Sequence, residues 1–166
     1  MAVDAFIKFI NGNGTTIDGE SSDAKHKNEI EILSYSFGIE NSSGHATGGG
    51  GGAGKATFHD FHFVSHLQKS SPVLFLKCAT GEHIKQGIIS VRKSGGGQPD
   101  YLKITLSDVI VSSFDQSVAA DDHDDFPMEE ISLVFQGVRI EYTSQNQKGA
   151  VGDTIVAEWP PTAGVP

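Results

Sequence analysis

Apolar and polar residues alternate along much of this chain with the period of two that is typical of half-buried β-strands. The pattern is clear between Glu29 and Ile39, where large apolar side chains take the odd positions from 33 onward and small residues take the even positions. The apolar set is Leu33, Tyr35, Phe37 and Ile39. We therefore expect one strand with this set in the core and with Ser34 and Ser36 in water.

Similar runs predict further strands at residues 5–10, 57–64, 83–93, 101–114, 130–143 and 155–159. Glycine-rich turns such as Ser94–Asp100 separate some of them. The run at 130–143 has apolar residues at positions of both parities, among them Leu133 and Val138. That pattern predicts a strand covered on both faces, by a core and by a neighbour.

One segment has the start and stop signals of a helix instead of a strand. Ser71 suits an N-cap, Pro72 suits the first helical position, and Gly81 follows the last turn. We expect a short α-helix from about Pro72 to Thr80. Its core face would carry Leu74, Phe75 and Cys78, which recur at spacings of three and four.

Together these elements predict a mainly β protein: two packed antiparallel sheets forming a barrel-like fold with one short α-helix at its side. No internal repeat or linker divides the chain of 166 residues. We expect a single domain over residues 1–159, followed by a flexible C-terminal tail at 160–166.

A glycine-rich segment matches part of a phosphate-binding loop. Gly49, Gly54 and Lys55 have the P-loop spacing, but Ala56 stands where a Ser or Thr would bind magnesium, and a strand-like run follows in place of a helix. We therefore expect no nucleotide cofactor. The segment is instead predicted to be an arm that becomes ordered against another subunit, formed by Gly48, Gly49, Gly50, Gly51, Gly52, Gly54 and Lys55.

Other candidate sites are weak. His59, His62 and His66, with Asp60 and His45, suggest a metal cluster, but strand residues three apart point to opposite faces. The acidic run Asp121–Asp125 lacks the spacing of a calcium loop, and no nucleophile elbow is present. We expect no metal, no cofactor and no enzymatic activity.

Charge and composition limit the partners. The formal net charge of -9 argues against binding nucleic acid. Cys78 is the only cysteine, so an intrachain disulfide is impossible. The apolar run at residues 1–10 is broken by Lys8 and lacks a basic start, and no run is long enough to insert into a membrane. We expect synthesis in the cytoplasm and, if the protein leaves the cell, a route that does not read a cleavable signal peptide.

Several blocks, taken in order, closely resemble the Hcp family (haemolysin-coregulated proteins), which build the inner tube of bacterial type VI secretion systems. The early blocks are Ile17-Asp-Gly-Glu-Ser, Ser34-Tyr-Ser-Phe-Gly38, and the glycine run leading into Phe58-His-Asp-Phe-His-Phe. The later blocks are Ser90-Val-Arg-Lys-Ser-Gly-Gly, Tyr101-Leu-Lys-Ile-Thr-Leu-Ser-Asp-Val and Glu130-Ile-Ser-Leu-Val-Phe. The resemblance covers nearly the whole chain apart from the tail.

This resemblance implies a structural protein that forms homohexameric rings, stacks them into a tube and is exported by the secretion machine. Its partners would be itself, other type VI secretion components and small effector proteins held in the ring lumen. Ser34 and Ser36 would then face the lumen, and the glycine-rich arm would cross a junction between subunits or rings. The alternative is a monomeric β-sandwich module that binds a protein or a carbohydrate.

Overall fold

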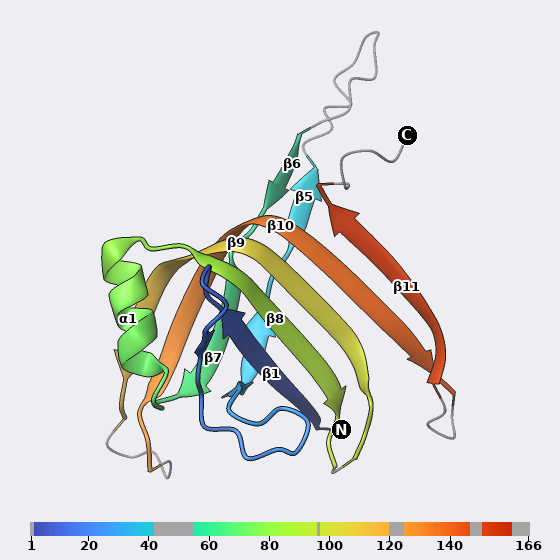
Figure 1. The fold of residues 1–166 in the computed structure, drawn as a ribbon, viewed down its shortest axis with the longest axis horizontal. Coiled ribbons are helices and arrows are strands. Elements are labelled where there is room, and N and C mark those ends of the chain that lie inside the picture. Colours follow the sequence, from blue (N-terminus) through green and yellow to red (C-terminus); the bar gives the residue numbers. More distant parts are fainter. Residues whose placement is uncertain (1, 42–54, 96, 120–124, 147–150, 161–166) are drawn as a thin grey trace, which may run out of the picture.

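The computed structural model describes residues 2–41, 55–95, 97–119, 125–146 and 151–160. Within these ranges the chain forms one helix and eleven strands (Figure 1). The first six strands are β1 (Val3–Ile10), β2 (Thr16–Ile17), β3 (Ile30–Ile32), β4 (Ser34–Ser36), β5 (Ile39–Asn41) and β6 (Ala56–Phe58). The remaining elements are β7 (Phe61–His66), α1 (Ser71–Thr80), β8 (Ile84–Lys93), β9 (Asp100–Ser117), β10 (Met128–Gln145) and β11 (Val151–Trp159).

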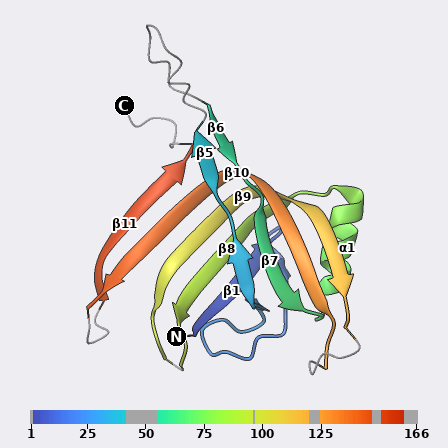
Figure 2. The same cartoon turned by 180° about the vertical axis from the view of Figure 1, so that it is seen from behind.

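The strands form two antiparallel sheets, which together with the single described helix confirms the predicted mainly β fold. Nine strands form the larger sheet, in the order β2-β1-β8-β9-β10-β7-β4, with β3 beside β1 and β11 beside β10. The other sheet is the pair β5 and β6. Figures 1 and 2 show that the larger sheet curls strongly, yet its described strands do not close into a barrel.

The core lies inside this curl. Its largest fully buried side chains come from most of the strands and from α1: Phe9, Phe61, Phe63, Ile7, Ile30, Leu74, Ile84, Ile89, Ile104, Leu106, Ile131 and Leu133. Strands β1 and β8 contribute from one side of the curl, and β7 and β10 from the other. One apolar cluster therefore holds strands that are far apart in sequence.

In both β9 and β10, the buried residues switch between even and odd positions near the middle of the strand. Asp108 has a left-handed backbone with φ of 53°, and Leu106 and Val109 on either side of it are both buried. In β10, Leu133 and Val138 are also both buried although an odd spacing separates them. The prediction of a strand covered on both faces is therefore wrong, because the irregularity brings both apolar sets to the same core.

The segment 29–39 is not one strand. Strand β3 pairs with β1, whereas β4 pairs with β7, so the chain changes partner at Leu33. Leu33 and Ile39 are 49% and 56% exposed, which contradicts their predicted burial. The middle of the pattern holds, because Tyr35 and Phe37 pack against the ring of Phe61 at centroid distances of 5.4 and 5.7 Å.

Helix α1 begins one residue earlier than predicted. Ser70 is the N-cap and makes no side-chain cap bond, while Ser71 lies inside the helix. The Ser71 hydroxyl donates to Oε2 of buried Glu129 at 2.8 Å and accepts the backbone N–H of Gln68 at 3.0 Å. Gly81 ends the helix as predicted, with a φ of 69° that suits glycine.

A buried arginine fastens the long connection after β2 to the sheet. The Arg92 guanidinium bonds both carboxylate oxygens of Asp23 and lies 3.3 Å from Asp4. It also lies 5.2 Å from the centre of the Phe6 ring, on which His26 stacks at 4.5 Å. Arg92 holds the pKa of Asp23 at about 2, below its usual 3.8.

Among the described residues, no helix is long and apolar enough to cross a membrane.

Candidate functional surfaces

The predicted wet residues Ser34 and Ser36 belong to a polar surface that spans four neighbouring strands. Strand pairing places two rows of residues across β4, β7, β10 and β9. The first row is Ser34, Val64, Glu130 and Asp115, and the second is Ser36, His62, Ser132 and Ser113. All eight are partly or fully exposed, because they alternate with the core residues of their strands. We call this surface the outer polar face.

The outer polar face is built for hydrogen bonding. Within the face, His62 Nδ1 lies 3.0 Å from Oγ of Ser132. Ser112, next in sequence to Ser113, donates its hydroxyl to Asp60 Oδ2 at 2.8 Å. Glu130 and Asp115 oppose each other on adjacent strands, so the face also has negative charge. Backbone N–H groups here are engaged in the strand ladder, which leaves no ready oxyanion hole beside the pair His62 and Ser132.

The last strand, β11, is exposed along its whole length. All nine of its residues are accessible to solvent, although β10 pairs with one of its edges. Four of them are large and apolar: Val151, Ile155, Val156 and Trp159 are 65%, 70%, 45% and 51% exposed. In the described part of the chain, the other edge of β11 has no neighbouring strand.

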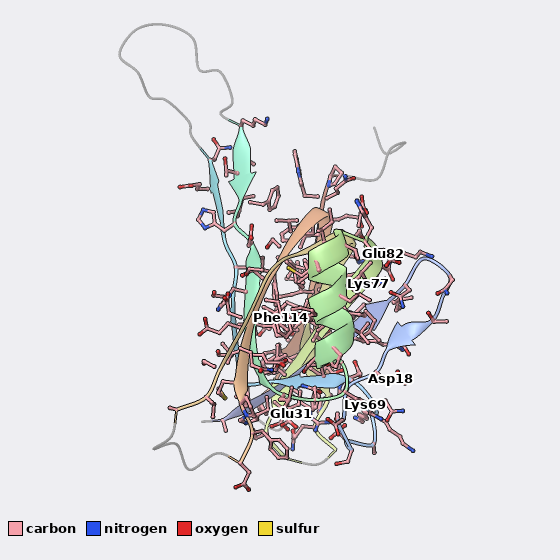
Figure 3. The ribbon with its side chains drawn as sticks, turned by 90° about the vertical axis from the view of Figure 1, so that its left-hand side faces the viewer. Asp18, Glu31, Lys69, Lys77, Glu82 and Phe114 are labelled. Atoms are coloured by element: carbon pink, nitrogen blue, oxygen red, sulfur yellow. The ribbon has the colours of Figure 1, made fainter. Side chains whose placement is uncertain are left out.

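Helix α1 exposes a second apolar surface. Only Ser71 and Leu74 of the helix are buried, whereas Val73, Phe75 and Leu76 are 41%, 58% and 59% exposed. The prediction that Phe75 faces the core is therefore wrong: it packs edge-on against Phe114 at the margin of a groove of about 390 Å³. Figure 3 shows Phe114 beside the helix, with Lys77 and Glu82 near its end.

Strands β5 and β6 form a hairpin that extends beyond the body of the molecule (Figures 1 and 2). All three residues of β5 are exposed, and so is Lys55, which precedes β6. Of the predicted arm, Gly48–Gly52 and Gly54 lie outside the described residues. Residues 56–58 form a strand where a P-loop would begin its helix.

Two of the candidate histidines have separate partners, whereas Nδ1 of His66 is buried without a hydrogen-bond partner. His59 Nε2 lies 3.2 Å from a carboxylate oxygen of Glu40, and His62 contacts Ser132. Among the residues that the structure describes, no three His, Cys, Asp or Glu side chains are grouped so that they could hold a metal ion. His45 and residues 121–124 of the acidic run lie outside the described ranges.

Comparison with known proteins decides the family. The sequence model of the type VI secretion system effector Hcp matches residues 6–142. The protein hcp1 of Pseudomonas aeruginosa is 40% identical over 151 residues, which cover 90% of this chain and 89% of that protein. This chain belongs to the Hcp family. Hcp proteins are structural components of the type VI secretion tube, associate with one another there and are secreted by that system.

Solved Hcp structures have the same fold. The crystal structure of Hcp1 from Salmonella typhimurium matches with a TM-score of 0.74 and 38% identity, covering 95% of this chain and 94% of that one. A type VI secretion system effector from Yersinia pestis matches with a TM-score of 0.71 and 32% identity, covering 93% and 98% of the two chains. These values confirm both the family and the fold that the sequence blocks suggested.

Sequence reasoning missed the outward apolar surface of α1 and the full length of β11. A signal for the first was present, because Lys77 is the only charged residue in a ten-residue helix. Such a helix is apolar on nearly all sides and is normally buried. For β11, Gly152, Asp153 and Thr154 are small or polar, and they carry little strand signal by themselves.

Proposed function

We propose that six copies of this Hcp chain close into a ring, that the rings stack into a tube, and that small effector proteins travel in the lumen. The observation that carries the proposal is β11, a nine-residue strand exposed along its whole length with four large apolar side chains in water. Exposed apolar patches of this kind mark association sites. A repeated contact between two different patches closes into a ring when its rotation closes.

The outer polar face, with Ser34 and Ser36, would line the lumen. Hydroxyl, imidazole and carboxylate groups dominate it. These groups bind water and protein cargo through hydrogen bonds and present little apolar surface to which cargo would adhere. A wall of this chemistry suits the passage of folded proteins, since hydrogen bonds to water and to cargo exchange easily. The arm at Gly48–Lys55 would cross to a neighbouring subunit or ring, because the strands β5 and β6 on either side of it in the sequence extend beyond the body of the subunit.

We also propose that the chain is made in the bacterial cytoplasm and leaves through the secretion machine without a cleavable signal peptide. Support comes from β1, where Ala5, Ile7 and Phe9 are buried in the core. Strand β1 pairs with β8 over its whole length. Residues 3–10 are therefore part of the folded protein and do not themselves form a cleavable leader.

The ring is tested by light scattering after size-exclusion chromatography of the full chain, together with negative-stain imaging. We expect a mass of six chains and rings of uniform size. A monomeric mass at all concentrations would refute the proposal and favour the monomeric binding module.

The lumen assignment is tested on rings of Ser36→Cys in a Cys78→Ser background. A small maleimide should label Cys at position 36 in rings and in dissociated subunits alike. A maleimide on a bulky polymer should react much more slowly in the rings, because the lumen hinders it. Asp18→Cys, at an exposed loop residue, is the matched control. Equal reaction of the bulky reagent at both positions in rings would refute the lumen assignment.

A further inference from the structure

We propose that the ring contact joins two different surfaces of the subunit: the outer face of α1 on one copy and β11 on the next. The α1 outer face consists of Val73, Phe75 and Leu76, with the adjoining groove. The inference rests on the proposed ring and goes beyond it, because it names what covers β11.

The composition of α1 indicates that a second surface, besides its own sheet, packs against the helix. The helix has one charged residue, Lys77, whose ammonium group pairs with Glu82 at 2.8 Å. Its own sheet buries only Ser71 and Leu74, and this leaves three large apolar side chains in water. A helix that is apolar on all sides is stable in water when it is covered on all sides, so the subunit alone is an incomplete environment for α1.

The groove beside α1 is suited to an apolar side chain. Leu67, Pro72, Phe75 and Phe114 form much of its lining. Its polar groups, the Ser71 hydroxyl and the Gln116 amide, already donate to the buried carboxylate of Glu129 at 2.8 and 3.1 Å. Because those donors are in use, the groove offers a partner mainly apolar surface, about 390 Å³ in volume.

Strand β11 supplies matching side chains. Successive strand residues point to opposite faces, so Ile155 and Trp159 share one face beyond the bulge that interrupts the pairing with β10 between Val151 and Thr154. Rim charges are also complementary: exposed Lys69 precedes α1, and exposed Asp153 lies on β11. The α1 outer face and this face of β11 thus agree in polarity and in charge.

The positions of the two surfaces decide how they meet. Figures 1 and 2 show α1 and β11 at opposite sides of the subunit, so they cannot touch within one chain. A rotation that brings α1 of one copy to β11 of the next uses each surface once per subunit. Repeating such a head-to-tail contact produces a ring when the rotation closes, whereas contact of β11 with β11 would stop at a dimer.

The test uses Leu76→Asp and Ile155→Asp, each placing a charge in one of the two surfaces. We expect each variant alone to be a folded monomer. Mixed together they should form one-to-one dimers and nothing larger, because the intact β11 of the first docks on the intact α1 of the second. Light scattering and native mass spectrometry measure the species, and circular dichroism checks the fold. Val3→Asp, at an apolar residue of similar exposure (54%) outside both surfaces, should still form rings.

Rings of Leu76→Asp would overturn the inference, and so would dimers of Leu76→Asp alone. Wild-type chain that forms no ring at all would refute the proposed function instead, so the two failures are distinguishable. A second measurement does not depend on charged variants folding: the pair Leu76→Cys and Ile155→Cys in a Cys78→Ser background, treated with a bifunctional maleimide. A ladder of up to six linked chains is expected, and rings that yield no ladder would contradict the contact.

Discussion

Two leucines on α1 allow the orientation of the helix to be tested with one substitution type. Leu74 is 1% exposed and belongs to the core, whereas Leu76 is 59% exposed, although only one residue lies between them. Leu74→Ala and Leu76→Ala make the same chemical change with the same small effect on helix propensity. Any difference between them therefore reports which side of the helix faces the sheet.

The expected magnitudes differ several-fold. Leu74→Ala removes buried methyl groups and leaves a cavity, which lowers the free energy of unfolding by about 2–5 kcal/mol. Leu76→Ala changes the subunit by no more than about 0.5 kcal/mol, since its side chain is in water. In the proposed ring the same Leu76 side chain is buried, and losing three carbon atoms at about 0.8 kcal/mol each weakens every subunit contact by roughly 2 kcal/mol.

Urea unfolding measures the subunit and light scattering measures the ring. Association stabilises the folded state by mass action, so unfolding is followed at a concentration at which rings have dissociated in all three proteins. The unfolding midpoint should fall for Leu74→Ala and stay near wild type for Leu76→Ala, with unchanged slopes. The concentration for half-assembly should rise for Leu76→Ala. Equal loss of subunit stability in both variants would refute the orientation of α1 described here.

Two further results are expected. Asp23→Asn should lower the free energy of unfolding at pH 6 but have less effect as the pH falls from 3.8 toward about 2, because the pKa of Asp23 is lowered in the folded state and the stability from its pairing with Arg92 is lost over that interval; a pH-independent difference in urea unfolding would contradict this. Gly81→Ala should cost about 1–2 kcal/mol in the same assay, because φ at Gly81 is 69° and a side chain strains that conformation; an unchanged midpoint would argue against the left-handed helix end.

The sequence predicted those parts of the fold that depend on local pattern. Apolar strand-like runs identified β8 and β10, and Pro72 with Gly81 located α1 to within one or two residues. Ser34 and Ser36 were correctly placed in water, because their parity along β4 is fixed by Tyr35 between them. Local signals suffice where one short element determines which side chains are buried.

What the sequence could not predict depends on partners distant in the chain. Leu33 and Ile39 fit the alternation, yet they are exposed because β3 and β4 pair with different strands. Arg92 contacts Asp23 across 69 positions, and nothing in the neighbourhood of either residue specifies the other. The switch between even and odd buried positions at Asp108 could not be predicted either. It depends on a left-handed backbone, which residues other than glycine rarely adopt, and an aspartate in a strand does not by itself indicate that conformation.

A long exposed strand such as β11 is a hazard, because its free edge can pair with further strands and start aggregation. In the proposed ring its cover is a helix, α1 of the next subunit. The backbone N–H and C=O groups of a helix are bonded within the helix, so α1 can bury the side chains of β11 but cannot extend its ladder. In a closed ring every α1 outer face and every β11 is then covered by a neighbouring subunit. In a lone subunit both apolar surfaces are exposed to water, and in the ring both are buried. Assembly is therefore favoured over a persistent monomer.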